Sequence, residues 1–126
     1  MNENELSKII LESDIEVHKT LGGPGLLESV YEESLAWELK SRGVSVQRQV
    51  EVPIKYKGRV LTALLRLDLL VERLDIVEVK AVAIYSKIFE AQALTYLRLM
   101  NLRLALVMNF GDVRISSGTH RVVNEL

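Results

Sequence analysis

The chain has 126 residues, enough for a single domain over residues 1–126, and a globular composition that is 48% hydrophobic and 26% charged. It contains no cysteine, which excludes a disulfide framework and a thiol nucleophile, and no apolar run is long enough for a transmembrane helix, so we expect a cytoplasmic protein without a membrane partner. The net charge is −1, but residues 1–40 carry −6 and residues 41–126 carry +5, a distribution that permits a polyanionic partner without requiring one.

Two helices are predicted at the start of the chain, over residues 4–19 and from about residue 25 to residue 41. Between them, three glycines and a proline within four positions predict a turn that ends at Gly25. Gly43 is typical of a helix end. The apolar residues that recur at helical spacing are Leu6, Ile9, Ile10 and Val17 in the first helix and Leu27, Tyr31, Leu35 and Leu39 in the second.

From Val44 the apolar period becomes two, which predicts three successive strands. They run from Val44 to Ile54, from Val60 to Val71 and from Ile76 to Ala81, with a turn at Lys57-Gly58. The residues of the first strand expected to share one face are Val44, Val46, Val50, Val52 and Ile54, with Arg48 as the charged exception. In the other two strands the odd-numbered positions are apolar. Pro53 suits an edge strand, because proline has no N–H for pairing.

The remaining chain predicts one more helix and two short strands. Residues 84–101 have a broad apolar surface at helical spacing. Leu104–Met108 is a fully apolar strand, residues 109–112 form a turn, and Val113–Ser116 is a last short strand. The order α-α-β-β-β-α-β-β predicts an α/β fold with a mixed central sheet flanked by helices.

Three charged residues, Asp68, Glu78 and Lys80, lie at even positions in the most hydrophobic segment of the chain. Glu78 and Lys80 project from one face of their strand. A turn of three residues, 72–74, would place Asp68 directly opposite Glu78, with Cβ atoms about 5 Å apart. Two such carboxylates repel each other, and a divalent cation such as Mg²⁺ offsets the repulsion. The arrangement suits phosphodiester hydrolysis, but the same residues also fit a surface ion-pair cluster.

Asp68 and Glu78-Val79-Lys80, after a leading helix and before a helix that contains Gln92, resemble the PD-(D/E)XK nuclease superfamily. More narrowly, the spacing of Gly25, Glu28 and Tyr31 is similar to the motif of the GxxExxY proteins, a group of small members of that superfamily. Leu67 stands where the name of the superfamily has proline. Further matches, in the expected order, are Tyr56-Lys57-Gly58, Arg66–Val71, Glu90–Leu97 and Asn109–Gly111.

The resemblance implies a restriction-endonuclease-like αβββαβ core and a metal-dependent nuclease, with DNA as the preferred substrate by analogy. Asp68 and Glu78 would hold Mg²⁺ or Mn²⁺, and Lys80 would assist the attacking water. Glu28 would add an acidic group to the catalytic site, and Gln92 would help to shape it.

Each supporting residue also has a purely structural interpretation. Glu28 suits the first turn of a helix, where free N–H groups and the helix dipole favour a carboxylate. Gln92 can satisfy a buried polar group. Tyr31 is expected in the core with its hydroxyl bonded, rather than in catalysis.

The alternative function is a catalytically inactive nuclease fold that binds nucleic acid or another protein. A chain of this length has little outside the core to hold a duplex, so we expect an active form to be a homodimer or a subunit of a larger assembly. Lys55, Lys57 and Arg59 form a basic cluster at the first hairpin that could follow a phosphate backbone, although a solvated hairpin carries such charges as well. A third interpretation, with purely structural carboxylates, predicts neither metal nor nucleic-acid binding.

Overall fold

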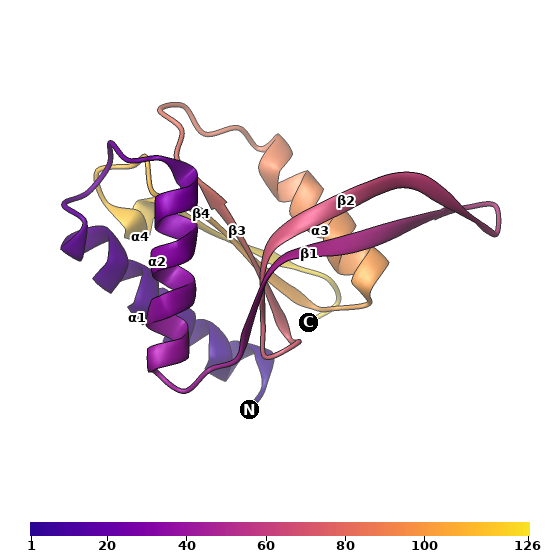
Figure 1. The fold of residues 1–126 in the computed structure, drawn as a ribbon, viewed down its shortest axis with the longest axis horizontal. Coiled ribbons are helices and arrows are strands. Elements are labelled where there is room, and N and C mark those ends of the chain that lie inside the picture. Colours follow the sequence, from indigo (N-terminus) through magenta and orange to yellow (C-terminus); the bar gives the residue numbers. More distant parts are fainter.

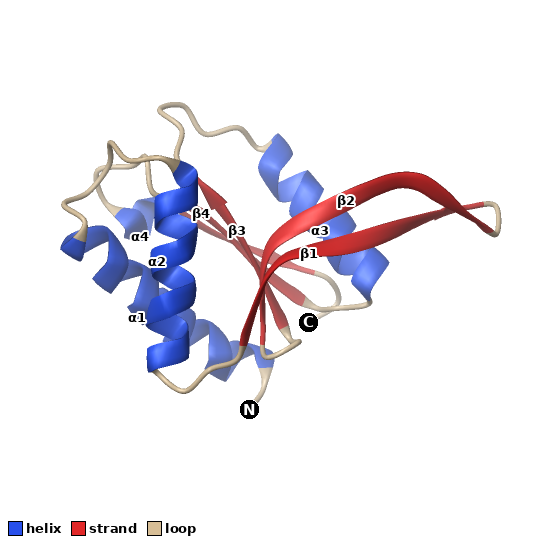
Figure 2. Ribbon diagram, in the orientation of Figure 1, coloured by secondary structure: helices blue, strands red, loops and turns tan.

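The computed structural model describes residues 1–126 as a five-stranded mixed sheet with helices on both faces (Figures 1 and 2). Strand order follows the sequence, β1-β2-β3-β4-β5, and only β3 and β4 pair in parallel. No helix is both long and apolar enough to cross a membrane. The mixed α/β fold predicted from the sequence is confirmed. The elements are α1 (Glu3–Thr20), α2 (Glu28–Ser41), β1 (Val46–Tyr56), β2 (Arg59–Val71), β3 (Asp75–Lys80), α3 (Ile88–Met100), β4 (Leu104–Asn109), α4 (Ile115–Gly118) and β5 (Thr119–Val123).

Helices α2 and α3 both begin later than predicted, because the residues before them adopt other backbone conformations. Helix α2 begins at Glu28 rather than near residue 25, because Gly25 has a φ of 118°, which no helix accommodates. Helix α3 begins at Ile88 rather than at residue 84. The preceding chain is held in the loop by Asn109, whose side chain accepts a hydrogen bond from the Val82 N–H and donates one to the Val82 carbonyl, at 2.9 and 3.0 Å.

The predicted last strand at Val113–Ser116 is wrong. Residues 113 and 114 form a bend, Ile115 starts the short helix α4, and β5 begins only at Thr119. The apolar alternation that suggested a strand has another origin, because Ile115 is buried in the core beneath α1 while Val113 is exposed. The Thr119 hydroxyl then donates to the Ile115 carbonyl at 2.8 Å, which closes the helical turn before the strand.

The two faces of the sheet are covered by different helices. Helices α1 and α2 pack on one face and α3 on the other. Four of the five residues predicted to share one face of the first strand are divided between the two faces, so that prediction is wrong. Val44 and Val46 belong with α1 and α2, whereas Val50 and Val52 belong with α3. The strand changes face at Gln49, whose φ of 53° interrupts the extended alternation.

In strand β2, the apolar side chains also move from one face of the sheet to the other, next to Gln49 of β1. Leu69 and Val71 pack with α1 and α2, whereas Leu65 and Leu67 pack with α3. Beyond this level the β1–β2 hairpin leaves the body of the molecule, and residues 53–64 form a projecting arm (Figure 1). The arm closes in the predicted turn, where Lys57 and Gly58 both have positive φ, as a tight two-residue hairpin requires.

Asp75, the first residue of β3, introduces a pH dependence into the stability of the fold. It is fully buried, and neither carboxylate oxygen has a hydrogen-bond partner. Burial raises the pKa of Asp75 to about 7, and the nearby Glu3 charge raises it further. Because the folded-state pKa lies above the unfolded one, the stability falls as the pH rises from about 4 to about 7 and stays low above that range.

The substitution Asp75→Asn is therefore expected to raise the free energy of unfolding by about 1–3 kcal/mol above pH 7 and to flatten its decline between about pH 4 and pH 7. Urea unfolding at several pH values measures both effects. An unchanged pH slope in the variant would show that Asp75 does not titrate in this range.

Candidate functional site

Asp68 and Glu78 meet where strands β2 and β3 separate. The turn between the strands has the three residues that were predicted, and the pairing of Leu69 with Val77 sets Asp68 opposite Glu78 at the next position. Backbone pairing between β2 and β3 ends at this position, and hydrogen bonds from the two carboxylates to backbone N–H groups take its place. The Asp68 N–H donates to Glu78 Oε2 at 2.7 Å, and the Val79 N–H donates to Asp68 Oδ2 at 2.8 Å. The two carboxylates thus mark the fork between the body and the arm.

The carboxylates at the fork are hard to ionise together. Glu78 is only 5% exposed, and burial followed by the Asp68 charge raises its pKa to about 8. Glu28, the first residue of α2, also interacts electrostatically with these groups. Burial raises the pKa of Glu28, the Lys80 charge opposes that rise, and Asp68 adds to it. The structure therefore brings Asp68 and Glu78 into direct contact, and Glu28 interacts with them electrostatically.

Lys80 is the cation of the site. It is half-buried at the end of β3, and its Nζ lies 4.8 Å from the centroid of the Phe89 ring at the start of α3. Burial raises the pKa of both Glu78 and Glu28, and the Lys80 charge partly opposes that rise. Its ammonium is thus held between the acids and an aromatic face, where it can interact with an anion that approaches the fork.

Tyr31 fixes the loop that leads into Glu28. Its buried hydroxyl donates to the Gly23 carbonyl at 2.7 Å and accepts from the Leu26 N–H at 3.2 Å, while its ring stacks on Phe110 at 4.6 Å. The prediction of a bonded core tyrosine is confirmed. Glu28 lies in the first turn of α2, as its structural interpretation expects, whereas Leu27 at the cap position makes no side-chain hydrogen bond.

The substitution Tyr31→Phe is expected to lower the free energy of unfolding by about 1–2 kcal/mol, because two loop backbone groups lose their partner. The loop before Glu28 should also exchange its amide hydrogens faster. Urea unfolding and hydrogen exchange measure the two effects. The matched control is Tyr56→Phe, which removes an exposed hydroxyl from the arm, and equal stability losses in the two variants would contradict the role of Tyr31.

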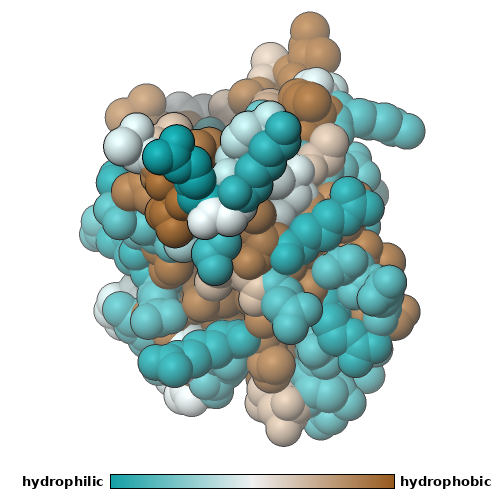
Figure 3. Space-filling view, turned by 90° about the vertical axis from the view of Figure 1, so that its right-hand side faces the viewer, coloured by the Kyte–Doolittle hydropathy of each residue, from teal (hydrophilic) through white to brown (hydrophobic).

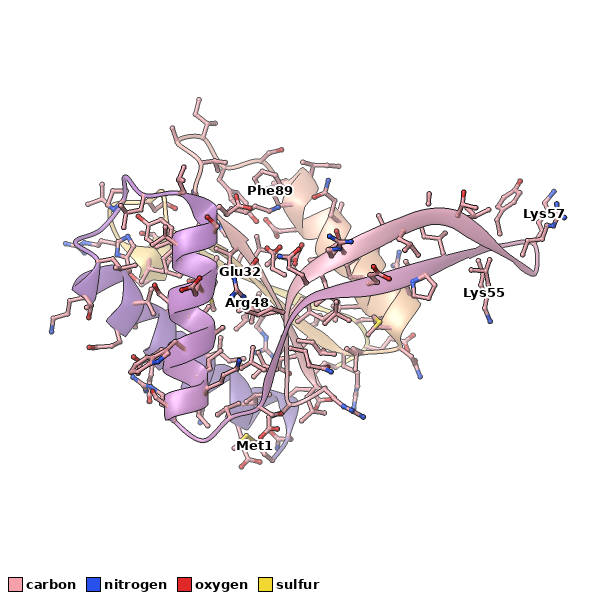
Figure 4. All side chains as sticks on the ribbon, viewed as in Figure 1. Met1, Glu32, Arg48, Lys55, Lys57 and Phe89 are labelled. Atoms are coloured by element: carbon pink, nitrogen blue, oxygen red, sulfur yellow. The ribbon has the colours of Figure 1, made fainter.

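Sequence reasoning missed a polar chain that reaches Asp68 from helix α2. Glu32 Oε2 accepts from Arg48 at 3.0 and 3.1 Å, and Glu32 Oε1 accepts from Gln49 Nε2 at 2.7 Å (Figure 4). The same Gln49 nitrogen donates to Asp68 Oδ1 at 3.3 Å. Two signals pointed here: Glu32 follows Glu28 by one helical turn, and Arg48 was the charged exception on an apolar face. With Glu28, these residues line an open pocket of about 660 Å³.

Gln92 is not bonded to the fork. It is exposed on α3 and lines a shallow pocket of about 210 Å³ with Leu65, Thr95 and Tyr96. Tyr96, which the sequence reasoning did not select as a site residue, is electrostatically closer to the acids. Burial raises the pKa of Tyr96, and the charges of Glu78 and Asp68 raise it further.

The donor set fits a hard divalent cation, although no three acidic or histidine side chains are already gathered as a metal cluster. Asp68 and Glu78 supply carboxylate oxygens from facing strands, and burial, followed by their mutual repulsion, raises the pKa of Glu78. A divalent cation would remove that repulsion, since it favours the ionised form of both groups. The paired, largely buried acids are thus the groups of this chain best suited to hold Mg²⁺ or Mn²⁺.

Comparison with known families agrees with this geometry. The sequence matches a family model described as the PD-(D/E)XK nuclease superfamily over residues 4–122, nearly the whole chain. No curated protein and no solved structure matches the chain. The matched region contains both carboxylates of the fork and Lys80.

Proposed function

The chain belongs to the PD-(D/E)XK nuclease superfamily, and from this premise we propose that it hydrolyses phosphodiester bonds of nucleic acid in a metal-dependent reaction at the β2–β3 fork. The observation that carries the proposal is the meeting of Asp68 and Glu78 on facing strands, with Lys80 two residues beyond Glu78. Glu78 is buried and Asp68 half-buried beside one ammonium, a costly placement for two carboxylates at a point where the sheet opens.

In this proposal Asp68 and Glu78 hold Mg²⁺ or Mn²⁺. The bound cation would supply an activated water and neutralise charge on the phosphoryl group. Lys80 orients the attacking water and stabilises the negative charge that develops on the phosphoryl oxygens. Its contact with Phe89 restricts the ammonium to the neighbourhood of the acids.

Glu28 and Gln92 have supporting roles in the proposal. Glu28 is a further acidic group, because its carboxylate interacts with both Lys80 and Asp68. Gln92 shapes the edge of the site beside Tyr96 rather than touching the acids.

The spacing of Gly25, Glu28 and Tyr31 supports membership of the GxxExxY group within the superfamily. Each residue has a distinct structural reason. Gly25 adopts a φ of 118° that favours glycine, Tyr31 ties the loop down, and Glu28 then begins α2 beside the fork.

A second function is favoured by one observation. Each carboxylate already accepts a backbone N–H, and no third acid completes a metal cluster. These bonds would also suit a catalytically inactive module that keeps the fold and binds nucleic acid without cleaving it.

A cleavage panel separates the two functions. The full chain is incubated with end-labelled single- and double-stranded DNA and RNA in Mg²⁺, in Mn²⁺ and in EDTA. We expect cleavage of DNA only when a divalent metal is present. Binding of the same substrates without cleavage in either metal would overturn the nuclease and favour the inactive module.

A further inference from the structure

The arm, residues 53–64, combines positive charge with exposed apolar side chains. It carries Lys55, Lys57 and Arg59 and no acidic residue. Val60 is 61% exposed and Leu64 is 49% exposed, although both are large and apolar. Lys55 and Lys57 lie at the far end of the arm, and the surface seen from that side mixes hydrophilic and hydrophobic side chains (Figures 3 and 4). A segment of this composition is suited to a partner that is both acidic and apolar.

Two exposed apolar residues of the arm, Val60 and Leu64, lie on either side of an irregularity in the β1–β2 register between Pro53 and Lys55. Pro53 pairs with Leu64 and Lys55 with Val60, and directly opposed residues project to the same side. The neighbouring pair, Val52 with Leu65, packs with α3 on the other side. Leu64 thus projects to the side opposite Leu65, and Leu64 and Val60 are both exposed.

Two other kinds of partner, an added β-strand and a nucleic-acid backbone, fit the arm less well. Strand β1 is the edge of the sheet, but Pro53 lacks an N–H there and Lys55 adds charge, two features that hinder the addition of another strand. A phosphate backbone would bind the cations, yet it would gain nothing from exposed Val60 and Leu64. The arm is therefore better suited to contact a protein surface through these side chains.

A groove between α1 and α2 has the complementary chemistry. Its volume is about 470 Å³, and no lysine or arginine lines it. Glu16 and Glu33 stand on its walls with apolar Val17 and Leu21, and Trp37 is 69% exposed beside them. Glu38 also lines the groove but is already paired with Arg42 at 2.8 Å. Glu16 accepts a hydrogen bond from the Thr20 hydroxyl at 3.2 Å, but no cation is paired with Glu16 or Glu33, so both charges remain available next to the exposed indole ring.

We propose that the arm of one copy docks in the α1–α2 groove of a second copy of this chain. The cations of the arm would meet Glu16 and Glu33, and its exposed apolar side chains would cover Trp37. The contact has to form between copies, because the arm and the α1–α2 layer lie at opposite ends of the molecule (Figure 1). Two copies that exchange arms reciprocally form a closed dimer, whereas a one-way contact builds a chain of copies.

Sedimentation equilibrium of a charge-swapped pair tests the proposal without metal or nucleic acid. The arm variant is Lys55→Glu with Lys57→Glu, and the groove variant is Glu16→Lys with Glu33→Lys. We expect the wild-type chain to self-associate and each variant alone to do so at least about tenfold more weakly, since like charges then face each other. An equimolar mixture of the two variants should associate again, because every arm then finds an oppositely charged groove.

A control variant with the same change in net charge shows whether any loss of association is specific to the groove. The variant Glu5→Lys with Glu125→Lys makes the same change in net charge outside the groove and should associate like the wild type. Circular dichroism verifies that each variant is folded. A wild-type chain that stays monomeric, or a mixture that does not associate, would overturn the proposal.

The remaining possible outcome of the test is that the arm binds nucleic acid instead of a second copy of the chain. An arm variant that loses affinity for a short DNA duplex but self-associates like the wild type would assign the arm to nucleic acid and overturn the docking. Failure of the nuclease proposal would leave these sedimentation results unchanged, so the two proposals fail independently.

Discussion

Replacement of Lys80 by Met is expected to reduce metal-dependent cleavage by about 10²–10³-fold at saturating metal. Methionine keeps the length of the side chain and its contact with the Phe89 ring but removes the charge. That charge would stabilise the phosphoryl oxygens only as the transition state forms, so the loss should fall on kcat rather than on KM. Single-turnover cleavage of labelled DNA at several substrate concentrations measures both constants.

The matched control for this variant is Lys40→Met, which removes an exposed ammonium from the far end of α2. It should leave cleavage within about twofold of the wild type, as an exposed charge far from the fork contributes little. Equal losses in the two lysine variants would point to a general electrostatic effect and remove Lys80 from the reaction.

Replacement of Glu78 by Gln is expected to stabilise the protein without metal and to abolish its stabilisation by metal. The folded-state pKa of Glu78, about 8, lies above that of an unfolded glutamate, so ionisation lowers stability as the pH rises from about 4.5 to about 8. The glutamine amide carries no charge and can still accept the hydrogen bond from the Asp68 N–H. The gain in stability should therefore be greatest above pH 8.

Thermal unfolding in EDTA and in excess Mn²⁺ measures both effects. A metal concentration one hundred times Kd would raise the stability of the wild type by about 2.7 kcal/mol and that of the variant by far less. The control is Glu5→Gln, which alters an exposed carboxylate in the first turn of α1. Loss of stability in EDTA together with an intact metal effect would make Glu78 a structural residue.

The fork could be predicted because its geometry follows from counting residues. A three-residue turn fixes which residues of β2 and β3 face each other, and a period of two fixes the face of Glu78 and Lys80. Asp68 is therefore opposite Glu78 whatever the rest of the sheet does. The same counting could not show that the strands separate at this level, because the separation depends on where the arm is packed.

The polar chain through Glu32, Arg48 and Gln49 could not be predicted in the same way. Its middle residue, Gln49, adopts a φ of 53°, a conformation that the local sequence does not favour for glutamine. On one side of Gln49, Val50 and Val52 pack with α3, and on the other Arg48 meets Glu32 of α2. A strict alternation assigns all five apolar residues of the predicted first strand to one face, and that assignment failed at Gln49.

The carboxyl-terminal part of the fold was mispredicted because a short element contains too few residues to show a clear hydrophobic periodicity. Residues 113–116 contain only two apolar positions, which fit a strand and a helical turn equally well. Tertiary contacts decide between the two. Ile115 is buried beneath α1, and the Thr119 hydroxyl bonds to its carbonyl, so the chain turns once before β5 begins.

Isothermal titration of Mn²⁺ and Mg²⁺ into the wild type, Glu78→Gln and Asp68→Asn is the most direct test of the metal-dependent site. At a pH above 8, where Glu78 is ionised, we expect the wild type to bind and both variants to lose that binding. The wild-type affinity should also weaken towards pH 6, as protons compete for Glu78. Equal binding by all three proteins, or no binding by the wild type, would contradict the assignment of Asp68 and Glu78 as metal ligands.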